Sequence, residues 1–251
     1  MSGSLSAQVA FVTGASRGIG RAIALKLAAA GCDVAFVYHN SHEDAEAVCA
    51  AIRAHGRRAL AIQSDVSDPT LVAEAFEAFG QQFDRVDILV SNAATGVLRP
   101  TLELTLKHWR RCLETNALAL QTLAVKAVPL MRNGGRIVAI SSLGACRAIP
   151  HYAFIGASKA ALEAVARSLA QELGPRGIRV NTVSAGVVDT DALKHFPNRE
   201  QLLEEYARRS PAGSALTPED VANAVFLLCL PEAAMINGHT LVVDGGYSIS
   251  G

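Results

Sequence analysis

Residues 9–20 read V-A-F-V-T-G-A-S-R-G-I-G, and this stretch indicates the class of fold. Its leading apolar residues have the pattern of a short buried strand, and an amphipathic helical pattern begins at Gly18. Glycines between a strand and a helix let the backbone approach a pyrophosphate, whose charge is stabilised by the free N–H groups and the dipole of the helix. The stretch therefore predicts a nucleotide-binding loop at the start of an α/β domain.

The alternation of short apolar runs with longer helical patterns continues to the end of the chain. Strands that are apolar on both faces and joined by helices indicate a parallel sheet covered on two sides. We predict one doubly wound Rossmann-type α/β domain over residues 1–251, with a seven-stranded parallel sheet and helices on both faces. The expected strands are Gln8–Thr13, Asp33–Tyr38, Arg58–Gln63, Val86–Ser91, Gly135–Ile140, Ile178–Val183 and Thr240–Val243. The expected helices are Gly18–Ala30, His42–His55, Pro69–Gln82, Thr105–Met131, His151–Leu173 and Pro218–Leu230.

One long interruption of this rhythm, at about residues 185–214, follows the sixth expected strand. Open α/β sheets bind ligands outside the carboxyl ends of their strands, and long excursions on a tight fold are usually functional. We therefore expect a substrate lid in this segment. A contact between subunits is the alternative.

The composition argues against several other classes of protein. Lys plus Arg and Asp plus Glu number 23 each, so there is no general charge that would attract nucleic acid or an anionic membrane. The five cysteines are odd in number and lack a C-x-x-C spacing, which argues against a disulfide framework or a metal site. The most apolar long stretch, residues 117–131, is too short to span a bilayer, and no secretion signal is recognisable. We expect a cytoplasmic globular protein.

A second polar stretch follows the fifth expected strand, where residues 141–159 read S-S-L-G-A-C-R-A-I-P-H-Y-A-F-I-G-A-S-K. Ser142, Tyr152 and Lys159 bring a hydroxyl, a phenol and an ammonium to the carboxyl end of a strand, which predicts a reaction centre. Tyr152 and Lys159 are separated by close to two turns at about 3.6 residues per turn, so we expect both on nearly the same face of one helix. His151 should point away from that face, as a surface histidine.

The residues after the second expected strand bear on the choice of dinucleotide. NAD sites usually place an acid there to hold the ribose 2′-hydroxyl, but residues 38–41 read Y-H-N-S. Arg17 in the glycine loop could make paired hydrogen bonds with a 2′-phosphate; a solvated loop charge is the alternative. His39 and Asn40 are candidates for further phosphate contacts. The pattern favours NADPH.

Several motifs together resemble the short-chain dehydrogenase/reductase superfamily over essentially the whole chain. They are T-G-x-x-x-G-x-G from Thr13, N-A-A from Asn92, Asn116, Ser142, the Tyr–Lys pair, and V-D-G-G from Val243. Most carbonyl-reducing members of that superfamily use Tyr-x-x-x-Lys, but here Ile155 stands four residues before Lys159, and the phenol comes three residues earlier. This Tyr-x6-Lys spacing resembles the enoyl-acyl-carrier-protein reductases. With the words A-I-P-H-Y, S-A-G and D-T-D-A-L-K-H-F-P-N-R, the chain is most similar to the NADPH-dependent type III enzymes.

The resemblance implies reduction of a trans-2-enoyl thioester, carried by acyl carrier protein, in a homotetramer. It also implies that Thr190 contacts the nicotinamide carboxamide. In the mechanism that we expect, Lys159 holds the nicotinamide ribose, adds positive charge and lowers the pKa of the phenol. The predicted catalytic residues are Tyr152, Lys159, Ser142 and Asn116. The predicted cofactor-binding residues are Gly14, Ser16, Arg17, Gly18, Ile19, Gly20, His39, Asn40, Asp65, Val66, Asn92, Ala93, Lys159, Gly186, Val188 and Thr190.

The spacing has a physical rationale. Moving the phenol three residues back shifts it by about 4.5 Å along a helix. In an enoyl thioester the hydride reaches C3 while negative charge develops on the thioester oxygen, so a displaced donor suits that oxygen. Ser142 either binds the substrate oxygen or only lines the pocket, and Asn116 either bends its helix and orders water or is purely structural. The alternatives for the whole protein are a carbonyl reductase of 3-oxoacyl or hydroxysteroid type, and a protein that binds NADPH without turnover.

Overall fold

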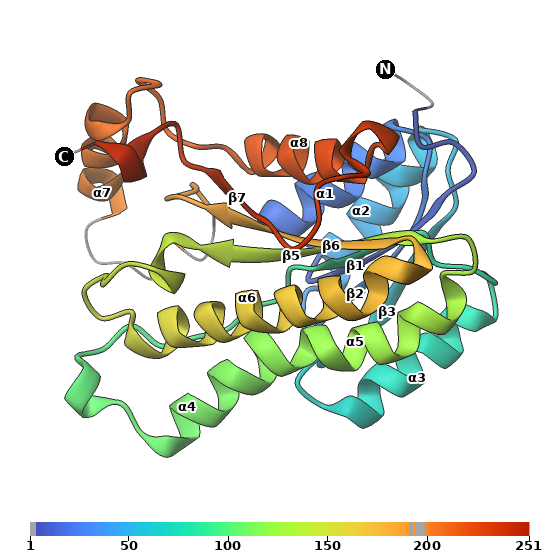
Figure 1. Ribbon diagram of the computed structural model, residues 1–251, viewed down its shortest axis with the longest axis horizontal. Helices are drawn as coiled ribbons and strands as arrows, with labels where there is room; N and C mark the ends of the chain where they lie inside the picture. Colours follow the sequence, from blue (N-terminus) through green and yellow to red (C-terminus); the bar gives the residue numbers. More distant parts are fainter. Residues whose placement is uncertain (1–3, 191–192, 194–198, 251) are drawn as a thin grey trace.

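The computed structural model describes residues 4–190, 193 and 199–250, and within them seven parallel strands form one sheet (Figure 1). The order across the sheet is β3-β2-β1-β4-β5-β6-β7. The strands are β1 (Val9–Thr13), β2 (Asp33–Tyr38), β3 (Ala59–Gln63), β4 (Ile88–Ser91), β5 (Gly135–Ser142), β6 (Ile178–Ala185) and β7 (Thr240–Val243). The predicted doubly wound sheet is confirmed. The chain order reverses between β1 and β4, which is the crevice where such sheets bind ligands.

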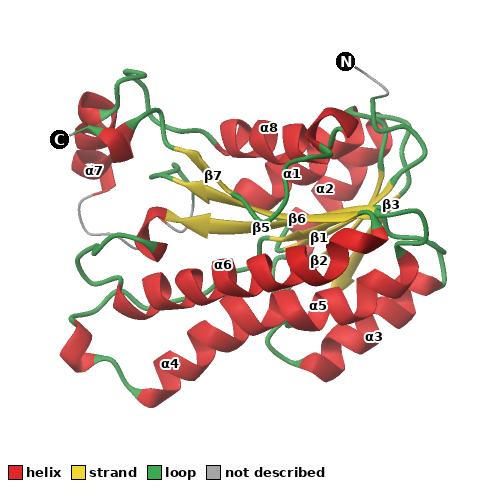
Figure 2. Cartoon of the chain, in the orientation of Figure 1, coloured by secondary structure: helices red, strands yellow, loops and turns green. Residues whose placement is uncertain are grey.

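Helices cover both faces of the sheet (Figure 2). They are α1 (Gly18–Ala29), α2 (His42–Ala54), α3 (Pro69–Gly80), α4 (Leu106–Leu113), α5 (Ala119–Ala127), α6 (Ala153–Leu173), α7 (Arg199–Arg209) and α8 (Pro218–Cys229). One face carries α1, α2 and α8, and the other carries α3 to α6 (Figure 1). Each face is therefore sealed by apolar contacts, which explains why the central strands read as unbroken apolar runs.

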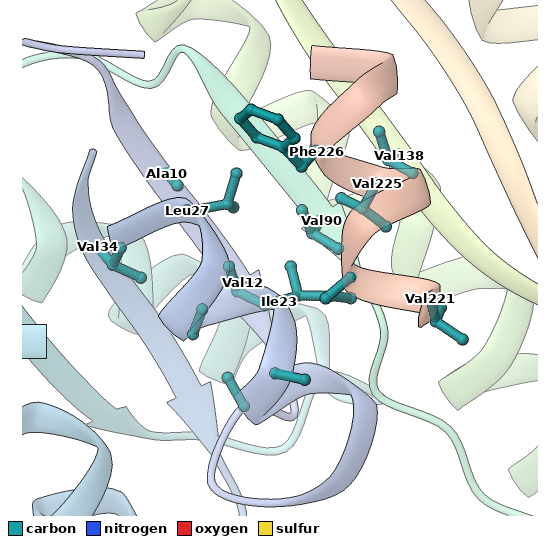
Figure 3. Close-up of a cluster of buried hydrophobic side chains, with 14 of the residues drawn as sticks. Ala10, Val12, Ile23, Leu27, Val34, Val90, Val138, Val221, Val225 and Phe226 are labelled. Atoms are coloured by element: carbon teal, nitrogen blue, oxygen red, sulfur yellow. The ribbon is translucent and has the colours of Figure 1, made fainter. Parts of the chain in front are cut away.

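The core on the first face is built where α1 and α8 pack side by side over the central strands (Figure 3). Ile23 and Leu27 of α1 meet Val225 and Phe226 of α8 above Val12 of β1, and all of them are buried. Burial of each large apolar side chain contributes about 1.5–3 kcal/mol. This packing holds the carboxyl ends of β1, β4, β5 and β6 at one edge, where the polar residues of the site lie.

Two strands are longer than predicted. β5 and β6 continue to Ser142 and Ala185 because their pairing extends through Ser141↔Ser184 and Ser142↔Ala185. Both serines of β5 therefore have strand geometry, and Ser142 is the last residue of the strand.

The expected helix over Thr105–Met131 is divided. A π-helical turn, Glu114–Leu118, separates α4 from α5, and a 3₁₀ turn follows at Val128–Leu130. π-Helical turns inside α-helices often occur at functional sites, and this one contains Asn116. The expectation that Asn116 distorts its helix agrees with this geometry.

Two further expectations need correction. The helix expected from His151 begins at Ala153, with Tyr152 as its N-cap at φ −111° and ψ 11°. The excursion at 185–214 contains α7, which was not predicted, while residues 191–192 and 194–198 of that expected lid lie outside the described residues. No helix in the described part of the chain is long and apolar enough to cross a membrane.

Candidate active site

The carboxyl ends of β1 and β4 are tied together around the glycine-rich loop. Thr13 Oγ1 accepts hydrogen bonds from the backbone N–H groups of Asn92 at 2.9 Å and Ala93 at 3.0 Å. The Asn92 amide donates to the carbonyl oxygens of Thr13 at 2.9 Å and Gly14 at 3.1 Å. A Cβ atom at Gly20 would overlap the Gly14 carbonyl oxygen. Glycine at position 20 thus lets α1 close onto a loop that Asn92 holds in place.

The N-terminus of α1 is open to an anion. Its N-cap, Arg17, is extended and makes no side-chain capping hydrogen bond, and the first turn contains no acid. Gly14 and Gly18 have left-handed φ angles of 67° and 56°, which residues with a side chain rarely adopt. A Cβ at Gly18 would lie 3.5 Å from Thr190 Cγ2, so Thr190 lies against the loop. Uncapped N–H groups and a helix dipole fit the predicted pyrophosphate.

The ends of β2 and β3 carry an ion-pair cluster beside this loop. Asp65 Oδ2 lies 3.2 Å from Arg111 Nη2 and 3.7 Å from His39 Nε2. Partial burial acts to raise the pKa of Asp65, but hydrogen bonds from Ser67 and the charge of Arg111 outweigh it, so the pKa lies below its usual value. His39, Asn40 and Arg17 are exposed to solvent. Other predicted contacts are buried or half-buried: Ser16, Ile19, Val66 and Ala93.

The loop after β5 positions the side chain of Tyr152. Its ring lies on Gly144 of a 3₁₀ turn (η4, Leu143–Ala145), where a Cβ would lie 2.6 Å from two ring carbons. Its hydroxyl donates a long hydrogen bond of 3.4 Å to Ser142 Oγ. The structure therefore brings the predicted phenol and hydroxyl together. We expected Tyr152 on the same helix face as Lys159, but Tyr152 precedes the first residue of that helix.

Lys159 is buried and points at the sheet. Its Nζ donates a 2.7 Å hydrogen bond to the Ile140 carbonyl oxygen of β5. Burial lowers the pKa of Lys159 to about 8, while the charges of Cys112 and Glu163 oppose that fall. Burial also raises the pKa of the Tyr152 phenol, and the hydrogen bond with Ser142 opposes this. The pKa of the phenol therefore lies above its usual value, with burial as the largest cause, whereas we expected Lys159 to lower it.

Asn116 joins the loop after β4 to α6. Its Oδ1 accepts from the Thr95 backbone N–H at 2.8 Å, and its Nδ2 donates to the Thr95 carbonyl at 2.9 Å. The same Nδ2 lies 2.9 Å from Ser158 Oγ, which donates to the Ile155 carbonyl at 2.7 Å. The hydrogen bonds of the amide are therefore made to the loop after β4 and to α6, the helix that carries Lys159. These contacts are structural, and they accompany the distortion of the helix at Glu114–Leu118.

Ile155 has the position of the phenol in Tyr-x-x-x-Lys enzymes. It packs against Gly96 so closely that a Cβ there would overlap Ile155 Cγ1. Beyond this contact, between the loop after β4 and α4, lies a hollow of about 460 Å³. Its lining residues are Thr95, Gly96, Val97, Leu106, Lys107, His108, Arg110, Arg111, Cys112 and Glu114. The hollow adjoins the reaction centre without including it.

The chain beyond β6 is anchored by α7. Tyr206 Oη donates a 2.7 Å hydrogen bond to the Asp244 carbonyl, and a Cβ at Gly186 would overlap that hydroxyl. Val188 is buried and forms a β-bridge with Leu216. Gly186 and Val188 therefore fix the path of the backbone that brings Thr190 to the glycine loop.

Three residues near the site lie outside the set predicted from the sequence. Glu163 Oε1 accepts a 2.6 Å hydrogen bond from Ser141 Oγ, next to Ser142. Gly144 supports the phenol and Arg111 pairs with Asp65. Of these three, only Glu163 could have been found from the sequence, because it follows Lys159 by four residues on one helix and such residues are neighbours.

Comparison with known proteins finds relatives that cover almost the whole chain. Residues 14–248 match the family model described as Enoyl-(Acyl carrier protein) reductase. The chain is 40% identical over 244 residues to 1-cyclohexenylcarbonyl-CoA reductase of Streptomyces collinus, covering 96% of this chain and 87% of that one. It is 39% identical over 247 residues to a 3-oxoacyl-[acyl-carrier-protein] reductase of Synechocystis sp., covering 96% and 97%. A short-chain dehydrogenase of Burkholderia cenocepacia, solved in complex with NADP, superposes with a TM-score of 0.90 at 40% identity over 98% of this chain and 99% of that one.

Proposed function

This chain belongs to the short-chain dehydrogenase/reductase superfamily, and we propose that it reduces the C2=C3 double bond of trans-2-enoyl thioesters with NADPH. One observation carries the proposal. The phenol beside Ser142 comes from Tyr152, seven residues before Lys159, while the position four residues before Lys159 is the apolar Ile155 packed on Gly96. A carbonyl reductase of the Tyr-x-x-x-Lys type has its proton donor at that second position.

The glycine loop supports NADPH as the cofactor, which supplies a hydride when bound. The open N-terminus of α1 would bind the pyrophosphate. Arg17, His39 and Asn40 are exposed beside it and would hold the 2′-phosphate, with no acid at the end of β2 to repel it. Lys159 would hold the nicotinamide ribose, and Thr190 the carboxamide. The NADP found in the Burkholderia cenocepacia relative supports the same choice.

Tyr152 and Lys159 would stabilise the negative charge that develops on the thioester oxygen. Because burial raises the pKa of Tyr152, the phenol stays protonated at neutral pH and can donate a hydrogen bond to that oxygen. Lys159 adds positive charge from a buried position, where such charge is most effective. Ser142, at hydrogen-bond distance from the phenol, orients it. C2 then takes a proton from water or from the Tyr152 phenol, which completes the reduction.

The proposed substrate is carried by acyl carrier protein, and the proposed assembly is a cytoplasmic homotetramer. Two outer surfaces support an assembly, because large apolar side chains on them are exposed. One surface, along α4, the π-helical turn and α5, contains Leu106, Leu118 and Val125; the other, near α8 and β7, contains Leu227, Met235 and Val242. Light scattering of the purified protein would test the tetramer.

The assay that tests the activity compares oxidation of NADPH and NADH with crotonyl-CoA and with acetoacetyl-CoA. We expect turnover with NADPH and crotonyl-CoA, and a loss of about 100-fold or more in kcat for Tyr152→Phe, since removal of one positioned donor typically costs about 10²–10³. Near wild-type activity of Tyr152→Phe would contradict the proposal. Preference for acetoacetyl-CoA would instead support carbonyl reduction, which the Synechocystis relative and the retained Ser142 favour.

A further inference from the structure

The residue before the phenol has an uncommon backbone. Among the described residues other than glycine, only Ala7 and His151 have a positive φ, and both values are 62°. Left-handed backbone costs a residue with a side chain about 1–2 kcal/mol, and such costs are concentrated at functional sites. In this chain one of the two positions adjoins Tyr152.

His151 is the third residue of a turn that delivers Tyr152 to α6. The Tyr152 N–H donates to the Ile149 carbonyl at 3.2 Å, and Pro150 stands between them. Proline in the second place and left-handed backbone in the third are typical of a type II turn. Glycine or asparagine normally fills that third place, so histidine is the exception here.

The turn is held from both sides. The His151 carbonyl accepts a 3.2 Å hydrogen bond from the Arg99 N–H in the loop after β4, and the Tyr152 carbonyl accepts the first helical hydrogen bond of α6 from Gly156 at 2.8 Å. The phenol ring rests on Gly144. The His151 residue itself is exposed. The contacts that fix His151 in the site are therefore those of its backbone.

We propose that His151 is a positioning residue that acts through its backbone: its left-handed turn brings the Tyr152 ring onto Gly144 and the hydroxyl beside Ser142. An ordinary helical φ of about −63° at this position would rotate the chain by about 125° just before Tyr152. The ring would then leave Gly144. The inference rests on the role of Tyr152 in the proposed function.

Three substitutions distinguish an effect of the His151 backbone from an effect of its imidazole, because all three remove the ring but differ in how easily they adopt left-handed backbone. His151→Gly and His151→Asn retain easy access to left-handed backbone, whereas the branched side chain of His151→Val opposes it. We expect kcat for crotonyl-CoA to stay within about twofold in the first two variants. In His151→Val we expect it to fall by about 10- to 100-fold, with little change in the KM for NADPH, since small misplacements of reacting groups cost about that much.

Ala7→Val is the matched control, since it places the same side chain on the same φ in the loop before β1. It should lower the melting temperature and leave kcat unchanged. If His151→Val does not fold, His151→Ala takes its place, with a kcat below that of His151→Gly. A loss of kcat in His151→Gly equal to that in His151→Val would overturn the proposal in favour of the imidazole, and full kcat in His151→Val would also overturn it. Tyr152→Phe, measured in parallel, separates either result from failure of the proposed function.

Discussion

Replacement of Glu163 by glutamine tests whether this carboxylate keeps Lys159 protonated. Ser141 Oγ holds Glu163 Oε1 at 2.6 Å, and the carboxylate follows Lys159 by one helical turn. Burial lowers the pKa of Lys159 to about 8, against the charges of Cys112 and Glu163. The removal of one of these two opposing charges should lower that pKa further. The amide of glutamine can still accept the Ser141 hydrogen bond, so the change is mainly one of charge.

The size of the effect follows from the separation of the charges. The Cβ atoms of residues four apart on a helix lie about 5–6 Å apart, and at an effective dielectric constant of about 20 a pair of charges at that separation interacts by about 3 kcal/mol. Glu163 is half-exposed, so solvent should reduce this to about 1 kcal/mol, or about 0.7 of a pKa unit. The protonated fraction of Lys159 would then fall about threefold at pH 8, and by less than about 1.5-fold at pH 7.

The assay is the pH dependence of kcat for crotonyl-CoA reduction. A lysine with a lowered pKa is charged below that pKa and loses its charge as the pH rises through it, so activity falls on the alkaline side. We expect this alkaline limb to lie about 0.7 unit lower in Glu163→Gln. Glu172→Gln, the same change at an exposed position of α6, serves as the control. An alkaline limb that coincides in Glu163→Gln, Glu172→Gln and the wild type would refute the reasoning.

Three further predictions concern the glycines and the phosphate site. Gly20→Ala should abolish NADPH binding by fluorescence titration and lower the melting temperature, because its Cβ would overlap the Gly14 carbonyl; unchanged binding would contradict the loop geometry. Gly144→Ala should reduce kcat by about tenfold or more while sparing NADPH affinity, because its Cβ would lie 2.6 Å from the ring of Tyr152; an equal loss of affinity would indicate a general defect. Arg17→Ala should raise the KM for NADPH by about 10-fold or more and leave that for NADH within about twofold, and equal changes for both would show that Arg17 does not contact the 2′-phosphate.

The sequence by itself was sufficient for the sheet and the cofactor loop. Seven apolar runs separated by helical patterns predicted all seven strands to within a few residues. A strand that is buried on both faces has an unbroken apolar run, and this run can be recognised without knowledge of the neighbouring strands. The glycines at 14 and 18 follow from local backbone requirements in the same way, and Gly20 follows from its close contact with the Gly14 carbonyl six residues earlier. The prediction that Ser142, Tyr152 and Lys159 form a reaction centre needed only their chemistry and spacing.

Contacts between distant parts of the chain decided the rest. Asn116 hydrogen-bonds to Thr95, 21 residues earlier, so the bounds of the π-helical turn between α4 and α5 depend on a contact between distant residues. Arg111 meets Asp65 only because the fold brings α4 to the end of β3.

The position of the Tyr152 phenol shows most clearly which features follow from the sequence and which depend on tertiary contacts. Spacing predicted Tyr152 on the helix face of Lys159, but the chain makes a turn at Pro150 and His151, and α6 begins only at Ala153. Helical periodicity applies only where the helix has begun. Before that point, the packing of the ring on Gly144 and the hydrogen bond to Ser142 decide where the hydroxyl lies.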